Sequence, residues 1–451
     1  MEPLLFALGI LLAVVGVGLS IGLHEVGHLV PAKRFGVKVT QYMVGFGPTI
    51  WSRQHGETEY GIKAIPLGGY VRMLGMYPPP TGAPAGTAGR GTTGRFQLLA
   101  EEARAAAWEE VDPGDEPRLF YRLSAPRKAV VMLGGPLMNL LIAVGVFSVL
   151  LVGIGLPTPT TSVGQVFGCI PPAMQSEEAA RAALADPSGT DELCPAGSTE
   201  SPAAVVGLQA GDRITALDGQ PVTEWDEVTE VTRSRPGQQV RFSVTGESGS
   251  RDLDVALATV YRPELDEDGT TTGEIVRTGY LGVSPDVQYV GQPWSAVPAT
   301  MGDLTVRSGQ ALLTLPVRIA ELAADMVRGD ERDPESPVSV VGVGRLSGEV
   351  TAADEPIRSK IAILVSLLAG LNLFLFLFNL LPLLPLDGGH VAGAVWEGVR
   401  RRMAAIAGRP DPGPVDVATM LPVAYAVGIT LILLSSIVIL ADVINPISIY
   451  G

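Results

Sequence analysis

Cysteine, histidine and lysine are scarce in this sequence of 451 residues, which contains two cysteines and four histidines. Two thiols are too few for a disulfide-dense scaffold or for a zinc site made of paired Cys-x-x-Cys motifs. The formal net charge is −15, and most of the acidic excess lies in the middle segment, so nucleic acid is not expected as a partner. The amino-terminal apolar run also lacks the basic segment of a cleavable signal peptide, and we expect it to be retained.

Long uncharged apolar stretches are what the chain has in abundance. The mean hydropathy is +0.31, and four runs account for it: Leu4–Leu23, Ala129–Val152, Ile361–Leu381 and Leu421–Leu440. Each has roughly the ~20 residues that a helix needs to cross ~30 Å of hydrocarbon. Four buried core helices of this kind in one soluble chain would be unusual. The sequence therefore predicts four membrane spans.

Basic residues are distributed unevenly among the three loops between these runs. Four of the five lysines lie in or at the edge of the first loop, Val30–Arg127, and the third loop, Pro382–Met420, contains three consecutive arginines. The second loop, Leu156–Lys360, has no lysine before its last residue. The positive-inside rule then places the first and third loops in the cytoplasm and the second outside. Arg358 and Lys360, just before the third run, argue mildly for the opposite orientation.

A His-Glu-Val-Gly-His sequence directly follows the first run. His24 and His28 are four residues apart, so on a helix both imidazoles project from one face, as two ligands of a tetrahedral Zn²⁺ would. Glu25 lies beside them and can take a proton from an attacking water. The pattern also arises by chance, but polar residues at membrane depth are costly and usually functional. We interpret it as part of a zinc site rather than as two incidental helix-end histidines.

A catalytic zinc site needs a third protein ligand and an open position. The candidate is Asp387, which follows the third run in the sequence Leu-Pro-Leu-Asp-Gly-Gly-His. The first and third spans run in the same direction, so their carboxyl ends lie on one side of the membrane and the residues that follow them can meet. Two alternatives stay open: Asp387 caps a helix that begins near Gly389, or His390 is the third ligand or supports it.

The second loop contains a segment with the pattern of a small folded domain. In Ser201–Val222, glycines separate short apolar strands, and a helix-like stretch and a strand at Gln239–Val244 follow. This pattern resembles a PDZ domain, with its first strand at Val163–Val166 and an insertion at Phe167–Thr199. The insertion carries both cysteines, so an extracytoplasmic loop predicts a disulfide between Cys169 and Cys194.

Taken in order, the motifs resemble the site-2 protease family of intramembrane zinc metalloproteases, in its RseP-like branch with one PDZ domain. The resemblance implies a multi-span α-helical membrane protein with about four transmembrane helices, a membrane-associated β-hairpin region and an extracytoplasmic α+β PDZ domain. The expected segments are a first span with the zinc motif at 1–36, a β region at 37–76, a cytoplasmic linker and surface helix at 77–126, a second span at 127–156, the PDZ domain at 160–285, an amphipathic segment at 286–357, a third span with the second zinc motif at 358–395, a cytoplasmic loop at 396–419 and a fourth span at 420–445.

The same resemblance implies roles for individual residues. His24, His28 and Asp387 would hold the zinc, and Glu25 would be the catalytic base. Contacts with the substrate would come from Asn139 in the second span, Asn379 in the third span, and Gly68, Gly69 and Tyr70 in the β-hairpin. The PDZ domain would either exclude bulky substrates or dock a carboxyl terminus at the loop before Leu208 and the strand after it; we favour the size filter because the insertion crowds the domain.

The function implied is hydrolysis of peptide bonds within transmembrane segments of single-span membrane proteins, such as anti-sigma factors, in regulated intramembrane proteolysis. The expected location is the inner (plasma) membrane, with the zinc site toward the cytoplasm. The alternative is a non-enzymatic PDZ-bearing scaffold with a structural zinc, which would have no need of Glu25. A zinc transporter would require further ionisable residues within the spans, and the first, second and fourth runs contain none.

Overall fold

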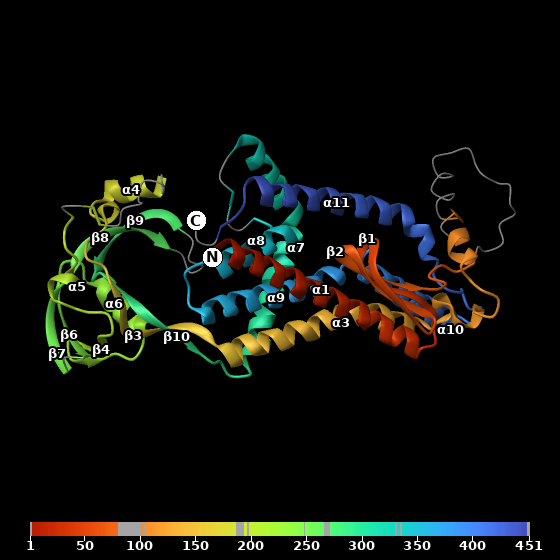
Figure 1. Cartoon of the computed structure of the whole chain (residues 1–451), viewed down its shortest axis with the longest axis horizontal. Helices are drawn as coiled ribbons and strands as arrows, with labels where there is room; N and C mark the ends of the chain where they lie inside the picture. Colours follow the sequence, from red (N-terminus) through yellow and green to blue (C-terminus); the bar gives the residue numbers. More distant parts are fainter. Residues whose placement is uncertain are drawn as a thin grey trace. The chain divides into compact units, whose positions relative to one another are not determined.

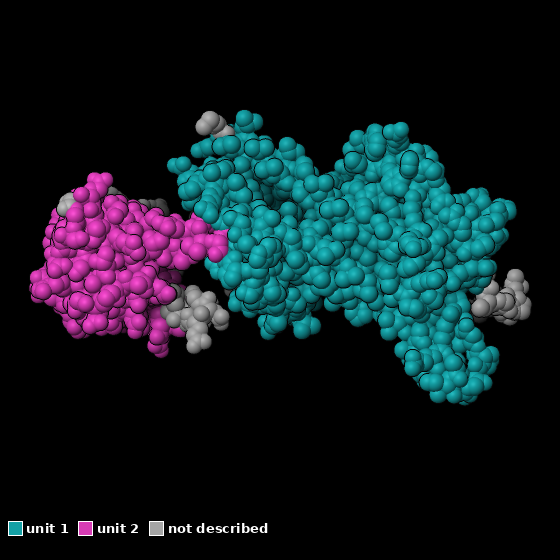
Figure 2. Space-filling model, turned by 90° about the horizontal axis from the view of Figure 1, so that it is seen from below, with its two compact units in different colours: residues 1–154, 292–451 teal, residues 155–291 magenta. Residues whose placement is uncertain are grey.

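The computed structural model describes residues 2–79, 101–102, 104–185, 194–195, 198–247, 249–265, 271–329, 332–333 and 336–448. The expected linker at 77–126 lies partly outside these residues, as does part of the cysteine-bearing insertion. The chain forms two compact units, residues 1–154 with 292–451 and residues 155–291 (Figure 2). The middle of the chain is therefore an insertion into a unit whose two halves are far apart in sequence.

The first unit is a helical bundle with a small sheet (Figure 1). Within the described residues, four helical segments are long and apolar enough to cross a membrane, the number that the sequence predicts. They are α1 (Glu2–Arg34), α3 with the π-helical turn that follows it (Ala125–Ile154), α9 (Ile357–Asn379) and α11 (Leu421–Ile444) with the short turn before it. The remaining long helices are α7 (Ala296–Arg328), α8 (Val340–Ala352) and α10 (Asp387–Ile406). The expected loop at 396–419 is thus helical as far as Ile406.

Helix α3 is central because it packs against α1, α9 and α10. Its contact with α1 depends on two glycines whose backbones almost touch. A Cβ atom on Gly27 would lie 2.2 Å from the carbonyl oxygen of Gly134, and a Cβ on Gly134 would lie 1.9 Å from that of Gly27. Only glycine permits this approach, because any side chain would push the two helices apart. The crossing sets the end of α1 that carries the histidine motif directly against α3.

The β region predicted for residues 37–76 is a curled sheet made of β1 (Val39–His55) and β2 (Thr58–Met73). Residues 41–44 of β1 pair on one side with residues 59–62 of β2 and on the other with residues 69–72. Tyr42 joins this sheet to α1, because its hydroxyl donates to the carbonyl oxygen of Gly22 over 2.7 Å. Burial raises the pKa of Tyr42 to about 12, so the hydroxyl remains a donor across the physiological range.

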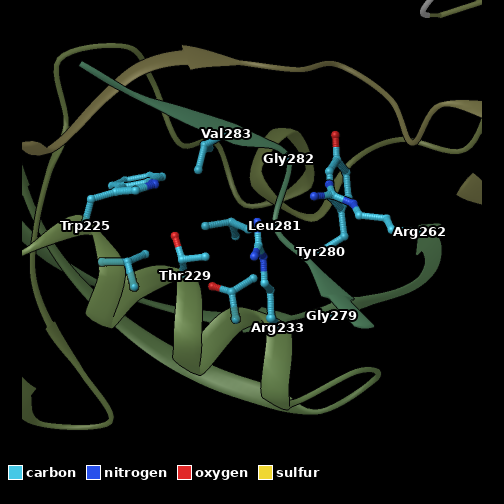
Figure 3. Close-up of a pocket in the computed structure, with 11 residues that line it drawn as sticks. Trp225, Thr229, Arg233, Arg262, Gly279, Tyr280, Leu281, Gly282 and Val283 are labelled. Carbon is cyan, nitrogen blue, oxygen red and sulfur yellow. The ribbon is translucent and has the colours of Figure 1, made fainter. Parts of the chain in front are cut away.

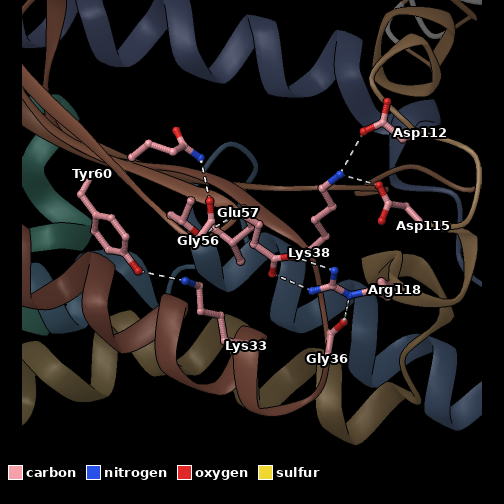
Figure 4. Close-up of polar contacts among 12 residues, drawn as sticks. Lys33, Gly36, Lys38, Gly56, Glu57, Tyr60, Asp112, Asp115 and Arg118 are labelled. Carbon is pink, nitrogen blue, oxygen red and sulfur yellow. Dashed lines mark hydrogen bonds and ion pairs between the residues drawn. The ribbon is translucent and has the colours of Figure 1, made fainter.

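Polar contacts hold the base of this sheet to the end of α1 and to residues 112–118 (Figure 4). The Lys33 ammonium donates to the Tyr60 hydroxyl over 2.8 Å. The Arg118 guanidinium makes two hydrogen bonds of 2.7 and 2.6 Å to Glu57 and a third of 3.2 Å to the carbonyl oxygen of Gly36. Paired hydrogen bonds of this kind fix direction as well as distance. The sheet therefore has a defined position next to the histidine motif.

The second unit is an α+β domain around one hydrophobic core, in which Ile214 and Phe242 are completely buried. The main sheet has the strand order β10-β3-β4-β6-β7, with β5 paired to β4, and β8 and β9 form a separate ribbon. The strands are β3 (Leu156–Val166), β4 (Arg213–Leu217), β5 (Gln220–Pro221), β6 (Gln239–Gly246), β7 (Gly249–Ala256), β8 (Ala258–Leu265), β9 (Thr271–Tyr280) and β10 (Val283–Val290). The helices are α4 (Glu177–Ala185), α5 (Pro202–Val205) and α6 (Trp225–Ser234).

Two sequence predictions for this unit can be compared directly with the structure. The first strand was expected at Val163–Val166, but β3 begins earlier, at Leu156, because its first residues pair with the end of β10. Cys169 and Cys194 are joined by a disulfide, as the sequence predicted. The disulfide closes the insertion between β3 and α5.

Candidate functional site

Three side chains from opposite ends of the sequence converge at the end of α1. The Nε2 atoms of His24 and His28 are 3.2 Å apart, and Oδ2 of Asp387 lies 3.3 Å from each of them. Zinc bonds of 2.0–2.1 Å with tetrahedral angles place neighbouring ligand atoms about 3.3 Å apart. The three atoms therefore have the spacing expected of three ligands of one zinc ion, which would need one further ligand such as water.

The local sequence explains how each ligand atom reaches the cluster. His24 and His28 are one turn apart on α1, so their rings lie on one face of the helix. Asp387 is the first residue of α10, where the positive end of the helix dipole favours a carboxylate. A Cβ on Gly388 would lie 2.2 Å from the carbonyl oxygen of Leu381, so only glycine allows the chain to turn this closely after α9. Asp387 is thus in the first turn of its helix rather than a cap before Gly389.

His390, the alternative third ligand, is not part of the cluster. Among the described residues, the group of side chains that could hold a metal consists of His24, His28 and Asp387. His390 lies one turn further along α10 and lines a small cavity of about 20 Å³ together with Lys128 and Glu397. Its place in the fold therefore favours Asp387 as the third ligand.

Two groups on helix α3 contact the histidine rings on the side that faces away from Asp387. Nδ1 of His28 lies 2.8 Å from the carbonyl oxygen of Val131, and Nδ1 of His24 lies 3.1 Å from Nδ2 of Asn139. Both contacts use the nitrogen that faces away from Asp387, which leaves Nε2 of each ring directed into the cluster. Partners of this kind fix ring orientation in metal sites. Asn139, expected to contact substrate, is instead only 1% exposed and contacts a candidate ligand.

A glycine on α3 leaves the space that an ion needs. A Cβ on Gly135 would lie 2.2 Å from Nε2 of His28 and 2.7 Å from Nε2 of His24. These distances are close to the length of a zinc–nitrogen bond, so a methyl group here and a bound ion would compete for the same volume. The two glycines at 134–135 thus differ: the first permits the helix crossing, and the second lies next to the ring nitrogens, where an ion held by them would need space.

Glu25 is 7% exposed and lies against β2. A Cβ on Gly69 would be 2.9 Å from Cγ of Glu25 and 3.1 Å from its Oε1, so this strand approaches the carboxylate with bare backbone. No hydrogen-bond partner for the Glu25 carboxylate is present among the described residues. Its oxygens are therefore available to a water molecule at the open side of the cluster.

The arrangement is suited to hydrolysis by an activated water. A zinc ion held by the three side chains would supply Lewis acidity at a carbonyl oxygen. Glu25, next to His24 in sequence, can accept the proton of the attacking water and deliver it to the leaving amine. Glu25 and His28 are both buried, so bulk water has little access to them.

The other residues expected to contact substrate belong to β2 and to the end of α9. Tyr70 stacks on Phe46 with ring centroids 6.2 Å apart, and Gly68 has a φ of 111°, which favours glycine. Both belong to β2 next to Gly69. Asn379 is the last residue of α9 and is partly buried.

Several buried polar residues near the site were not identified from the sequence. Asn372 on α9 is completely buried and donates to the Ser20 hydroxyl over 3.0 Å, one turn before His24 on α1. Lys128 on α3 and Glu397 on α10 form a buried ion pair of 2.7 Å. The sequence signal was an amide inside the third apolar run and a lysine at the start of the second. Neither pattern indicates which distant residue is the partner.

The second unit has a groove between α6 and the segment that joins β9 to β10 (Figure 3). The cavity has a volume of about 140 Å³, and its walls include Trp225 and Thr229 from α6 and Leu281 and Val283 opposite. Its residues are Trp225, Val228, Thr229, Thr232, Arg233, Arg262, Gly279, Tyr280, Leu281, Gly282 and Val283. The groove thus has both apolar and polar walls, and two basic side chains contribute to its lining.

The strand expected to take part in docking lies inside the sheet. The strand after Leu208 is β4, which pairs with β3 on one side and β6 on the other, so its backbone has no free edge for a peptide. Strand β10 ends the described sheet and borders the groove. Glycine-punctuated strands look alike in sequence, and only the strand order shows which one is at the edge.

Comparisons with known proteins identify relatives along almost the whole chain. A sequence profile described as Peptidase family M50 matches residues 12–409. The chain is 32% identical over 456 residues to the zinc metalloprotease Rip1 of Mycobacterium tuberculosis, covering 99% of this chain and 100% of that protein. It is 31% identical over 458 residues to Rip1 of Mycolicibacterium smegmatis, with coverage of 99% and 100%. It is also 25% identical over 435 residues to the zinc metalloprotease RasP of Oceanobacillus iheyensis, with coverage of 86% and 90%.

Proposed function

The chain belongs to peptidase family M50, and from this premise we propose which side chains form its active centre and what it cleaves. It is an intramembrane zinc metalloprotease, as its family and its relatives indicate. We assign the zinc to His24, His28 and Asp387 and the general-base role to Glu25. The observation that carries this assignment is the triangle of ligand atoms, with sides of 3.2, 3.3 and 3.3 Å.

The proposed substrate is a transmembrane segment of a single-span membrane protein, such as an anti-sigma factor. A helical segment has its carbonyl groups in i→i−4 hydrogen bonds, so it must unwind before its peptide bond can be attacked. Residues 69–72 of β2 have one strand neighbour, β1, within the described sheet. Their outer edge lies beside Glu25 and can hold an unwound chain by strand addition.

The second unit is proposed to be a PDZ domain that controls access to the protease. A size filter needs no ligand, but the groove favours an additional docking role for a carboxyl terminus. Arg233 and Arg262 both contribute to its lining, and neither has a carboxylate partner among the described residues. The Nε atom of Arg262 is buried without a hydrogen-bond partner. An unpaired guanidinium in a groove is suited to a carboxylate.

The proposed location is the plasma membrane, with the zinc site on the cytoplasmic side and the second unit outside. The disulfide in the second unit supports this orientation, because such bonds persist in oxidising compartments. Lysine on the first loop agrees with it. Labelling of single introduced cysteines with a membrane-impermeant reagent, on a Cys169→Ser and Cys194→Ser background, would test it. Labelling of the first loop in intact cells would contradict the proposal.

Reconstituted cleavage tests the function itself. The full-length protein in lipid vesicles is combined with a single-span substrate, with and without Glu25→Gln. We expect cleavage within the spanning segment by the unmodified protein and none by the variant, while both retain zinc. Cleavage outside the span would contradict the proposed substrate, and equal cleavage by both proteins would remove Glu25 from the mechanism.

The docking role has its own matched test. Arg262→Glu reverses the charge in the groove, whereas Arg277→Glu reverses that of an exposed arginine on β9, outside the lining. We expect the first variant to lose preference for a substrate with a free carboxyl terminus and the second to keep it. If both variants retain the preference, the domain acts by size alone.

A further inference from the structure

An apolar cleft lies among α1, α8 and α9 of the first unit (Figure 1). Its volume is about 250 Å³, and an apolar cavity of about 150 Å³ is already large enough for a benzene molecule. Among the described residues that line the cleft, only Ser347 has a polar side chain, and its hydroxyl donates to the carbonyl oxygen of Val343 over 2.8 Å. The lining is therefore suited to a hydrocarbon chain, which needs no hydrogen bonds.

The cleft lies away from the path proposed for the substrate. Gly16 lines it on α1, and Glu25, which is next to the β-sheet, follows nine residues later, or about two and a half turns of helix. The two residues therefore lie on opposite faces of α1. Asn372 and Ser20 also separate the cleft from the metal candidates, because their buried hydrogen bond of 3.0 Å joins α9 to α1 one turn before His24. A substrate chain held beside Glu25 would not enter the cleft.

The side of the cleft is open to the bilayer. Leu12 and Ile361 both line it, and they are 50% and 44% exposed. They belong to α1 and α9, which are long and apolar enough to cross a membrane. The material that surrounds such helices at this depth is the hydrocarbon of the bilayer. An acyl chain can therefore reach the cleft directly from the membrane.

A basic side chain lies next to the same cleft. Lys360 directly precedes Ile361, and its ammonium group donates to the carbonyl oxygen of Thr351 over 3.0 Å. Thr351 is one turn beyond Ser347 on α8, so the ammonium lies near the cleft, where α8 and α9 come together. An ammonium group has three donors, and this contact uses one of them. Arg358, two residues earlier, is exposed. The positive-inside rule does not explain these two basic residues in the orientation proposed above.

We propose that the cleft binds one acyl chain of a bilayer phospholipid, whose phosphate is held by Lys360. The aliphatic lining matches the acyl chain, and a cation at the end of a span matches a phosphate at the membrane surface. Asp354 and Glu355, which precede Lys360, are exposed acids, so the local charge suits a single phosphate rather than a headgroup of high negative charge. The lipid site is independent of the zinc ligands assigned above.

Photolabelling within a bilayer tests the lipid site. The full-length protein is placed in nanodiscs that contain a phosphatidylglycerol with a photoactivatable acyl chain, and labelled peptides are identified by mass spectrometry. Gly16→Leu fills the cleft, because a Cβ at this position already lies 3.4 Å from Cδ1 of Leu368. The matched control is Gly18→Leu, where a Cβ meets nothing within 4 Å. We expect labelling of α9 at the cleft to fall at least about fivefold in the first variant, the low end of the cost of overpacking a filled site, and to stay unchanged in the second.

Ordinary contact with the bilayer gives a different result. Ile432 on α11 is 67% exposed and serves as the reference for such contact. Equal labelling of the cleft and of Ile432, unaffected by Gly16→Leu, would overturn the proposal. A measurement on the unmodified protein covers the case in which Gly16→Leu does not fold. Labelling of the cleft should saturate as the fraction of the probe lipid rises, whereas labelling of Ile432 should rise in proportion; a proportional rise at both positions would also refute the site.

The phosphate contact and the substrate are tested separately. Lys360→Gln should lower labelling of the cleft about fivefold, the contribution of one basic residue near a lipid surface. Arg307→Gln, which changes an exposed arginine of α7, should leave it unchanged. Equal labelling in the two variants would contradict the phosphate contact and overturn the site as proposed. Addition of a single-span substrate to the Glu25→Gln protein should not displace the lipid, and displacement would instead identify the cleft as a substrate site.

Discussion

Replacing Gly135 by alanine should abolish zinc binding. The added Cβ would lie 2.2 Å from Nε2 of His28 and 2.7 Å from Nε2 of His24, where a bound zinc would be 2.0–2.1 Å from each nitrogen. The helix cannot shift away to make room, because the neighbouring Gly134 already touches the backbone of Gly27. The methyl group and the ion therefore exclude each other.

The size of the effect follows from opposite contributions to folding and to binding. Alanine is favoured over glycine by about 1 kcal/mol within a helix, but the added Cβ must also displace the two imidazole rings that it would overlap, so the variant should be less stable than its control. Zinc could bind only if the new methyl group moved away from the two imidazole rings. We therefore expect at least about a 100-fold loss of zinc affinity, roughly 2.7 kcal/mol. Zinc content should fall from one per chain to a small fraction at concentrations that saturate the unmodified protein.

The matched control is Gly145→Ala on the same helix, where a Cβ would meet nothing within 4 Å. Both variants are purified in parallel, and zinc is measured by elemental analysis alongside helix content and thermal unfolding. The control should bind zinc normally and be at least as stable. A folded Gly135→Ala protein with full zinc occupancy would refute the placement of the metal between these residues.

Other outcomes follow from the same structure. Glu25→Gln should keep zinc and lose roughly 10²–10⁴-fold in cleavage rate; near-normal turnover would assign the base to another group. Asp387→Asn should lose zinc while His390→Ala retains it, measured as metal content, and the reverse pattern would exchange their roles. Cys169 and Cys194 should resist thiol labelling in non-reduced cells, and labelling of both would count against the disulfide and the topology. Hydrogen bonds from Arg118 lower the pKa of Glu57, so this pair contributes stability above the ordinary carboxyl pKa and loses it as the pH falls through the lowered pKa. Amide exchange of the β1–β2 sheet should therefore accelerate in that acid range, and the acceleration should be larger in the unmodified protein than in Glu57→Gln. Equal acceleration in the two proteins would contradict this expectation.

Patterns that are local in sequence predicted the four apolar helices and the two histidines of the candidate site. The spacing of His24 and His28 fixes their common helix face, and the direction of successive spans indicated that Asp387 could reach them. The groups that orient the two rings could not be foreseen in this way. Val131 is 103 residues from His28 and Asn139 is 115 residues from His24, so their contacts depend on the angle and depth of a helix crossing.

The same distinction applies to the second unit. Alternation and glycine placement predicted some of its strands, but not that β4 lies inside the sheet and β10 at its edge. The buried ion pair of Lys128 and Glu397 was also not predicted, because 269 residues separate the two side chains in the sequence. A lysine near a span end normally indicates orientation, and only the packing of α3 on α10 shows that this one is paired.

The separation of the three metal-binding candidates along the chain also sets the timing of events during synthesis. Asp387 follows His28 by 359 residues, and between them lies the entire second unit. At about 5–20 residues per second, the nascent protein exists for roughly 20–70 s with two histidines in place and no carboxylate to complete the cluster. A newly made molecule therefore passes the insertion machinery, where other membrane segments are exposed, before its own active site can form.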